Sequence, residues 1–447
     1  MSKPESHKHR TTSVSSAILA ELQLYESRNI VQIAADSSWP IVWDRAQGMK
    51  VWDADELEYM DATSAFGVAA AGHANKRVVR AGRKQMGRLL HAMGDVHPHP
   101  GKALLARRLS ELTFGDPGLN GLPTGLGKGK TIFCNSGFEA VEAALKTACL
   151  ATGKSDVIAF EGAYHGLGYG SLNTTHRNHF KAPFLSQLKG FAHFVPFPET
   201  ESQAIGSLKQ ILHLSQKHPI GAVLFEPIQA RAGIRLPTDT FLVGLRKLTS
   251  ELAILLVADE IYTGFGRTGD WFACHRAGIV PDVYCLGKAL TGGFPMSACV
   301  GRAELMDRAW PHSSGEAIHT STFLGHPVGC AMALAQIDEI AKRKLLHRAQ
   351  CNGRFAISEF QKLAKASRWV RDVRGRGLMI GIELHEPIPG PIPIGVRVMK
   401  GLLAEGWIVL PEGEGSEVIA FTPPLIISKP EIKAFSSSLA RVLHSIQ

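Results

Sequence analysis

Two stretches decide the fold of this chain: Ala253-Ile254-Leu255-Leu256-Val257-Ala258-Asp259-Glu260 and Val283-Tyr284-Cys285-Leu286-Gly287-Lys288-Ala289-Leu290. Each begins with an apolar run that is typical of a buried strand, and a charged side chain follows the run. A carboxylate, Asp259, and an amine, Lys288, therefore stand 29 positions apart (288 − 259), each at a strand end. Because parallel strands present their carboxyl ends at one edge of a sheet, we expect both groups to face one ligand.

Composition limits the class of protein. The chain has 447 residues, of which 45% are apolar, so it can bury a large core with a smaller companion domain. Its 45 glycines and 24 prolines are spread along the sequence, as suits an α/β protein with many turns. The seven cysteines form no CxxC pair, which favours reduced core thiols over a disulfide framework or a zinc site.

The sequence also limits location and partners. Its start is polar, and no later stretch approaches the roughly 18 uninterrupted apolar residues of a membrane span, so we expect a cytosolic protein without membrane contact. The net charge of +9 comes from scattered lysines and arginines. Such scatter predicts a solvated surface with a bias toward anionic ligands and no nucleic-acid partner.

Helical and apolar segments alternate between about residues 75 and 330, which predicts a largely parallel sheet. The predicted strands cover residues 131–134, 156–160, 221–225, 254–258 and 283–286. Outside this region we expect disorder over the first fifteen residues, a helix over 16–28, a hairpin of 41–44 with 49–53, a helix over 327–344, strands within 370–384 and 418–425, and a helix over 430–445. The predicted division is a large domain over 71–330, and a small α+β domain that comprises 331–447 and the N-terminal residues 1–70.

Each predicted strand of the large domain is followed by a distinct chemical group. Asn135-Ser136-Gly137-Phe138 opens a helix whose free N–H groups could bind phosphate, and Tyr164-His165 offers an aromatic face. Glu226-Pro227-Ile228-Gln229 follows the next strand, and Asp259 and Lys288 complete the series. Pyridoxal phosphate (PLP) needs this set, since an amine forms a Schiff base with its aldehyde and a carboxylate keeps its ring nitrogen protonated.

Taken singly, each of these groups has an ordinary structural explanation, such as a helix cap or a turn. Other motifs are weaker still. Gly264 to Gly269 matches GxGxxG but is separated from its strand, and Gly129-Lys130-Thr131 precedes a strand and lacks the first glycine of a Walker A loop. His97 and His99 are too close for a helical metal-binding pair, so we expect no metal site there.

With these residues in view, the chain resembles the class III (omega-type) aminotransferases, which are PLP enzymes of fold type I. The resemblance rests on stretches along nearly the whole chain: Ser37-Ser38-Trp39-Pro40-Ile41-Val42-Trp43-Asp44, Phe66 to His73, Val257 to Gly269, Pro281-Asp282, Gly287-Lys288-Ala289, Thr320-Ser321-Thr322-Phe323 and Pro423-Pro424-Leu425. It implies an α/β protein with a mostly parallel central sheet flanked by helices, and a smaller α+β domain. It also implies PLP as cofactor.

The resemblance assigns roles around the cofactor ring. Lys288 would be the Schiff-base lysine and, after displacement by substrate, the general base. Asp259 would pair with the pyridinium. Ile261 would pack on the ring face opposite Tyr164, beside His165.

It also implies contacts at the polar edge of the cofactor. Ser136, Gly137 and Phe138 would hold the phosphate, Gln229 would reach the phenolic oxygen, and Glu226 would support the ring less directly. Thr322 would contact the phosphate of a neighbouring subunit, so the active site would be shared across a homodimer and a monomer would be inactive.

Three positions depart from the family pattern. Phe138 replaces a small or hydroxyl residue, Ala420 replaces an arginine that often grips the substrate carboxylate, and Arg231 replaces the glutamate that often partners that arginine. Together with Trp39 and Phe66, Ala420 and Arg231 are the candidate substrate contacts. Arg231 would bind a carboxylate from the opposite wall, or it would point to solvent while the pocket accepts uncharged amines.

The expected reaction is a ping-pong transfer of an amino group from a primary amine or amino acid to a keto acid or aldehyde. A 1,2-aminomutase or a racemase on the same scaffold would use the same Lys288 and Asp259, so these motifs leave those alternatives open. A PLP-fold protein that only binds partners is a further alternative, which the intact Lys288 and Asp259 disfavour.

Overall fold

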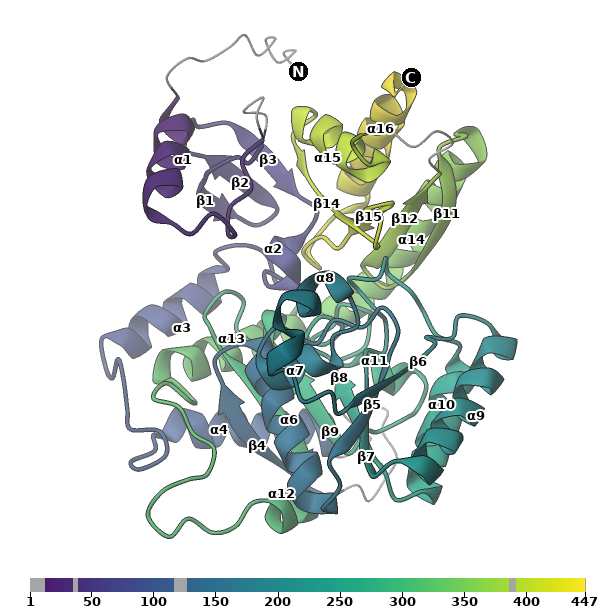
Figure 1. Cartoon of the computed structure of the whole chain (residues 1–447). Helices are drawn as coiled ribbons and strands as arrows, with labels where there is room; N and C mark the ends of the chain where they lie inside the picture. Colours follow the sequence, from purple (N-terminus) through teal and green to yellow (C-terminus); the bar gives the residue numbers. More distant parts are fainter. Residues whose placement is uncertain (1–12, 35–38, 116–126, 386–390, 447) are drawn as a thin grey trace.

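The largest sheet brings the predicted strand ends to one edge. A computed structural model of the protein describes residues 13–34, 39–115, 127–385 and 391–446. Within these residues, a seven-stranded sheet has the order β4-β10-β9-β8-β7-β5-β6 (Figure 1). The strands are β4 (Gly129–Cys134), β5 (Asp156–Phe160), β6 (Ala192–Val195), β7 (Ile220–Phe225), β8 (Leu255–Asp259), β9 (Val283–Leu286) and β10 (Ser297–Arg302). Strand β10 is antiparallel to both β4 and β9, and the other pairings are parallel.

Helices cover both faces of this sheet because successive strand residues point to opposite sides. Ile158, Val223 and Leu256 pack against α9 (Glu201–Lys217) and α10 (Asp239–Glu251). Their neighbours Val157, Leu224 and Val257 pack against α6 (Gly137–Thr152) on the other face. The central strands are therefore apolar on both sides, which explains their continuous runs of apolar residues in the sequence.

Two smaller sheets lie above the large one in Figure 1. One joins β1 (Trp43–Gln47), β2 (Lys50–Asp53), β3 (Glu58–Asp61) and β13 (Trp407–Ile408), so it pairs an N-terminal hairpin with a C-terminal strand. The other has the order β11 (Val370–Arg376), β12 (Met379–Leu384), β15 (Val418–Phe421) and β14 (Leu410–Glu412). Phe360, Phe421 and Phe435 pack together between this sheet and the helices α14 (Leu345–Ala366) and α16 (Lys429–Ser445).

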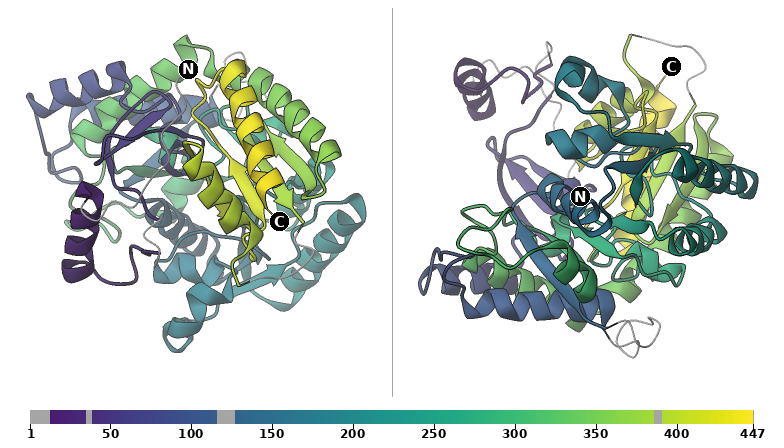
Figure 2. Two further views of the ribbon diagram at one scale, coloured as in Figure 1. Left: turned by 90° about the horizontal axis from the view of Figure 1, so that it is seen from above. Right: turned by 60° about the horizontal axis from the view of Figure 1, so that its bottom comes forward.

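The remaining helices complete the layers. Helix α15 (Ile394–Ala404) lies beside α16 in the view from above (Figure 2). The others are α1 (Val14–Tyr25), α2 (Ser64–Gly67), α3 (Lys76–Met86), α4 (Pro100–Phe114), α7 (Tyr169–Thr174), α8 (Asn178–Lys181), η1 (Ala182–Gln187), α11 (Ala273–Arg276), η2 (Lys288–Leu290), α12 (Ala303–Ala309) and α13 (Pro327–Lys342). Among the described residues, none of the helices has both the length and the apolar character that crossing a bilayer requires.

The structure confirms the predicted fold class and the five predicted strands of the large sheet. The strands β6 and β10 were missed, and β10 runs against its neighbours. The N-terminal helix begins at Val14, so the predicted disorder of the first fifteen residues is wrong at Val14 and Ser15, while residues 1–12 lie outside the described part. The boundaries at residues 70 and 330 stay a prediction.

Candidate active site

Asp259 and Lys288 come together through the pairing of β8 with β9. Asp259 is the last residue of β8 and lies in register with Cys285. Lys288 follows three residues later, where η2 begins, and its backbone has a φ of 34°. A positive φ is unfavourable for a residue other than glycine. The chain thus turns abruptly at the lysine, after strand β9.

Asp259 is buried against a histidine. Its Oδ2 atom lies 2.7 Å from Nδ1 of His165, and its Oδ1 atom accepts a hydrogen bond from the backbone N–H of Ile261 at 3.1 Å. The His165 side chain is fully buried, and its Nε2 atom makes no hydrogen bond among the described residues. A buried carboxylate held in this way can keep a positive charge on a bound ring nitrogen.

The Lys288 amine lies against an aromatic ring. Its Nζ atom is 4.2 Å from the ring centroid of Tyr262, and the Tyr262 hydroxyl lies 3.0 Å from Oγ1 of Thr422. Burial lowers the pKa of Lys288, while the charges of Asp259 and Glu412 oppose that shift. Burial raises the pKa of Tyr262 to about 12. The tyrosine therefore stays neutral and offers its ring face to the ammonium form of Lys288.

The predicted phosphate contacts Ser136, Gly137 and Phe138 lie at the start of α6. Ser136 caps this helix, and its buried hydroxyl has no hydrogen-bond partner among the described residues. The backbone N–H groups of Asn135 and Ser136 donate to Glu139 at 2.6 and 3.2 Å. The loop is thus fixed before the helix, whose N-terminal dipole favours negative charge.

Ile261 lies between the start of α6 and the turn that carries Lys288. A Cβ atom on Gly137 would lie 3.1 Å from Ile261, and one on Gly287 would lie 3.3 Å from it. Phe138 is 39% exposed and lies so close to Gly166, which has a φ of 108°, that a Cβ there would come within 2.3 Å of Phe138. The glycines at these positions let the backbone approach the side chains.

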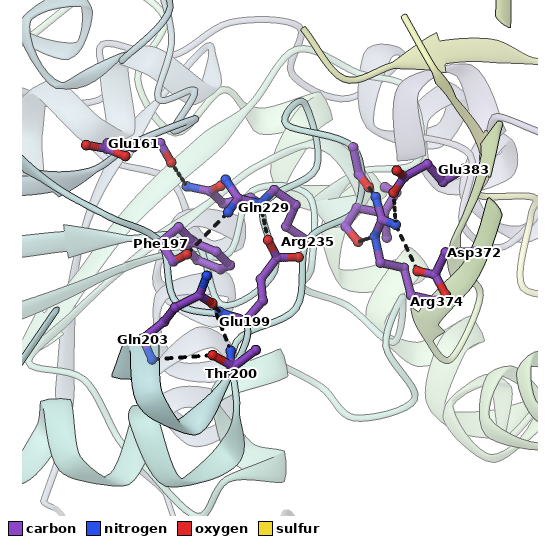
Figure 3. Close-up of polar contacts among 12 residues, drawn as sticks. Glu161, Phe197, Glu199, Thr200, Gln203, Gln229, Arg235, Asp372, Arg374 and Glu383 are labelled. Carbon is purple, nitrogen blue, oxygen red and sulfur yellow. Dashed lines mark hydrogen bonds and ion pairs between the residues drawn. The ribbon is translucent and has the colours of Figure 1, made fainter. Parts of the chain in front are cut away.

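Two residues after β7 have specific partners. Glu226 is buried and accepts hydrogen bonds from the backbone N–H groups of Tyr164 at 3.0 Å and Ala230 at 3.2 Å. Burial raises the pKa of Glu226 to about 7. Gln229 donates one amide hydrogen to the carbonyl oxygen of Glu161 at 2.9 Å, as Figure 3 shows, so its predicted contact with a phenolic oxygen stays a prediction.

Arg231 forms an ion pair with a residue that sequence analysis did not identify. Its Nη1 atom lies 3.0 Å from a carboxylate oxygen of Glu412, and its guanidinium carbon lies 5.8 Å from the ring centroid of Tyr164. The Arg231 side chain is 34% exposed, whereas that of Glu412 is 4% exposed. Burial raises the pKa of Glu412, and the charge of Arg231 opposes the shift. Neither of the two predicted environments of Arg231 includes this partner.

Hydrogen bonds and an ion pair fix the loop that carries Arg231. Arg374 on β11 donates to the carbonyl oxygens of Gly233 at 2.7 Å and Ile234 at 3.0 Å, and it forms an ion pair with Glu383 (Figure 3). On the other side, Nε of Arg235 lies 2.7 Å from Glu199. The backbone around Arg231 is thus anchored while its guanidinium stays accessible.

The other predicted contacts lie in different surroundings. Trp39 is partly buried and packs against two apolar clusters, and Phe66 is 57% exposed. Ala420 is buried with Ile228 and Tyr262 in a small apolar cluster. Thr322 is exposed in a segment that Asn135 contacts through a 3.2 Å hydrogen bond to Ser321. His99 caps α4 and lies 2.7 Å from the carbonyl oxygen of Gly325.

These surroundings fit PLP. The buried and unpartnered Ser136 hydroxyl lies at the predicted phosphate end, and the buried Asp259 carboxylate with its His165 partner lies at the predicted ring-nitrogen end. Lys288, whose pKa burial lowers, supplies the amine. Sequence analysis missed Tyr262 and Glu412. Tyr262 stands in the quoted Asp259 to Gly269 block, but Glu412 becomes visible only through the pairing of β14 with β15, where it lies opposite Val418.

Comparisons with known proteins identify the family and the fold of the chain. Residues 32–443 match the family described as "Aminotransferase class-III". The chain is 33% identical over 393 residues to an acetylornithine aminotransferase of Methanosarcina mazei, which covers 88% of this chain and 89% of that protein. It is 34% identical over 410 residues to the 5-aminovalerate aminotransferase DavT of Pseudomonas aeruginosa, with 90% and 93% covered. Its fold matches a PLP-bound amine transaminase from an uncultivated Pseudomonas species with a TM-score of 0.85, 24% identity, and 95% and 99% coverage.

Proposed function

The chain belongs to the class III aminotransferase family, and we propose that its amino donor is a primary amine that also carries a carboxylate, which Arg231 binds. The protein is a PLP-dependent transaminase that takes small amines and keto acids as substrates. When bound, PLP supplies an aldehyde that condenses with amines and a ring that accepts electrons. The residues around it determine where the substrate lies and where protons move.

Lys288 carries the proton transfer in this proposal. Its Nζ atom would take a proton from the substrate carbon next to nitrogen and later return one, and the first of these roles requires the neutral amine. Burial lowers the pKa of Lys288, so the neutral form is populated closer to neutral pH. Tyr262 offers the charged form a ring face at 4.2 Å. Burial favours the neutral amine and the Tyr262 ring favours the ammonium form, so both forms of Lys288 are accessible to a group that takes and returns a proton.

Asp259, Ser136 and their neighbours position the cofactor in this proposal. Asp259 keeps a proton on the ring nitrogen, and His165 holds the carboxylate in place at 2.7 Å. Ser136 and the backbone of Gly137 and Phe138 bind phosphate. Ile261, packed between Gly137 and Gly287, and Tyr164 cover the two ring faces.

The Arg231–Glu412 pair is the observation that carries the substrate assignment. Arg231 is accessible and has a planar guanidinium that can bind a carboxylate with two hydrogen bonds. Glu412 contacts the Arg231 guanidinium at 3.0 Å, which shows that a carboxylate can approach it. The relatives named for acetylornithine and 5-aminovalerate act on amines of this kind. Position 420 is an alanine, so it provides no second positive charge that would compete with Arg231 for the carboxylate.

We also propose a homodimer in the cytosol. Exposed apolar side chains gather on two segments, with Leu90, Met93 and Val96 on one and Ile318 and Phe323 on the other. The segments are neighbours, since the rings of His91 and Phe323 lie 5.3 Å apart. An apolar surface of this kind favours a protein partner, and a second copy would bring its Thr322 to the phosphate position. The seven free cysteines support a reducing compartment.

Steady-state kinetics test the substrate assignment. Arg231→Ala should raise KM for 5-aminovalerate by roughly tenfold to a hundredfold, because a charge-assisted pair contributes about 1.5–3 kcal/mol. It should leave KM for pentylamine, which has no carboxylate, within about twofold, while Arg308→Ala, at an exposed position on α12, serves as control. Equal effects on both donors would reject the role of Arg231. Product formation without a keto acid would instead favour the aminomutase or racemase alternative.

A further inference from the structure

A second cluster of ligand-type side chains lies at the opposite end of the large sheet from Lys288. Asp156 is the first residue of β5, His193 is on β6, and His218 caps the C-terminus of α9 just before β7. One ligand atom from each lies within 4.8 Å of those of the others. Residues this far apart in sequence meet only because three elements begin or end together at this edge.

The backbone holds the three positions at fixed separations. The N–H of Asp156 donates to the carbonyl oxygen of Pro219 at 3.1 Å, which ties β5 to the residue after His218. Ile158 and His193 are paired across the parallel β5 and β6 strands. Asp156 also accepts a hydrogen bond from the Ser155 hydroxyl at 2.7 Å, which orients its carboxylate. Outer contacts of this kind preorganise metal ligands.

The ligand atoms of the three side chains lie close to one another. Nε2 of His193 lies 2.8 Å from Oδ2 of Asp156, and the rings of His193 and His218 have centroids 4.1 Å apart. The Asp156 and His193 side chains are 19% and 22% exposed, so an ion can reach them from solvent. Ligands in zinc sites stand about 2 Å from the metal, so small side-chain rotations would bring these three ligand atoms, which lie within 4.8 Å of one another, around one ion.

We propose that Asp156, His193 and His218 bind one divalent transition-metal ion of the Zn²⁺ class. Two imidazoles and one carboxylate are borderline ligands that suit Zn²⁺ better than Ca²⁺ or Mg²⁺, and water completes the coordination. Binding breaks the His193–Asp156 hydrogen bond, because Nε2 of His193 must present a lone pair to the ion. The ion would join β6, which among the described strands pairs only with β5, to the junction of α9 and β7.

The site is independent of the transamination proposal, because it uses none of the residues assigned to the cofactor or substrate. Its effect is on stability. An ion that binds only the folded chain stabilises it by an amount that grows with the logarithm of the ion concentration divided by Kd, and so raises the midpoint of unfolding. The alternative is that the His193–Asp156 contact only stabilises the edge strand β6 and that no ion binds.

Isothermal titration calorimetry distinguishes these two interpretations. Tag-free holoenzyme, freed of metal by chelator and of unbound cofactor by dialysis, is titrated with ZnCl₂. Wild type should bind one ion that both His193→Ala and His218→Ala weaken by at least about tenfold, since even outer contacts of metal ligands are worth that much. His213→Ala, which removes an exposed histidine from the same helix, should bind like wild type.

Thermal unfolding provides the second readout. Added Zn²⁺ should raise the melting midpoint of wild type and of His213→Ala, and it should not raise that of His218→Ala. His218→Ala is the more informative variant because it leaves the His193–Asp156 contact intact, and its transaminase activity reports that it has folded. Zinc binding that is the same in His218→Ala and wild type would overturn the proposal, as would the absence of binding to wild type.

Discussion

Nδ1 of His165 lies 2.7 Å from Oδ2 of Asp259, and both side chains are buried beneath the predicted cofactor position. A hydrogen bond from the backbone N–H of His165 to Thr175 at 2.9 Å holds that residue in place. The histidine therefore fixes one oxygen of the carboxylate, while Ile261 fixes the other. The pair acts as a unit in which the aspartate supplies charge and the histidine supplies orientation.

Asp259→Asn should retain the fold and lose at least about a hundredfold in kcat, because the amide has a similar shape but no charge to hold a proton on the ring nitrogen. His165→Asn should weaken PLP binding by roughly tenfold, since it loses one hydrogen bond to a charged group. Cofactor titration of the apoprotein by fluorescence measures the second effect, with His213→Ala as control. An Asp259→Asn enzyme within a few-fold of wild type would show that the aspartate is only structural.

Lys288→Ala should reduce kcat by roughly a hundredfold to ten-thousandfold, the usual contribution of a general base. Lys84→Ala, on the exposed side of α3, should have no effect. Added methylamine should restore part of the lost rate in Lys288→Ala because a small amine can occupy the vacated space. If methylamine gives no recovery in an otherwise folded variant, the proton-transfer role is not supported.

Tyr262 should influence the charge state of Lys288 through its ring. Removing the ring in Tyr262→Leu removes a cation–π contact worth about 0.5–2 kcal/mol, which lowers the pKa of Lys288 further. Since cofactor uptake requires the neutral amine, the acidic limb of its pH–rate profile should move to lower pH. Tyr262→Phe keeps the ring, loses only the contact with Thr422, and should retain the wild-type profile. Identical profiles for the Leu and Phe variants would contradict this role.

Glu226 should make the apoprotein less stable as pH rises. Burial raises its pKa from 4.5 to about 7, so between these values the folded state holds a proton that the unfolded chain has released. The free energy of unfolding therefore falls as pH rises through this window. Compared with Glu226→Gln, wild type should lose roughly 2–3 kcal/mol between about pH 5 and pH 8, at about 1.4 kcal/mol per pKa unit. An equal change in the urea midpoint between the two pH values for wild type and Glu226→Gln would rule the effect out.

The apolar surface around Phe323 tests the proposed homodimer. Phe323→Glu should shift sedimentation toward monomer and reduce activity together with cofactor retention, because charge in a buried interface is unfavourable and the phosphate position would lose the partner's Thr322. Leu212→Glu, at an exposed position on α9, is the matched control. A monomeric Phe323→Glu protein with full activity would separate the active site from the subunit interface.

Five strands of the large sheet, and the residues that follow them, could be predicted from the sequence alone. Apolar runs such as 283–286 predict buried strands, because a strand covered on both faces is apolar throughout. The residues 136–138 predict the start of a helix. The family resemblance added predicted roles for these residues, together with Ile261 and Thr322. The strands β6 and β10 were not predicted because His193 interrupts the short apolar run of β6, and because β10 begins with Ser297 and has a glycine near its end.

Contacts between residues that are far apart in the sequence depend on the tertiary structure. Glu412 pairs with Arg231 because β14 lies beside β15, and Tyr262 faces Lys288 because the chain turns at a positive φ. The Asp156, His193 and His218 cluster likewise exists only where three elements meet at the sheet edge. Sequence patterns report local periodicity and chemistry, whereas side-chain pairing across 62 positions (218 − 156) or 181 positions depends on how the layers pack.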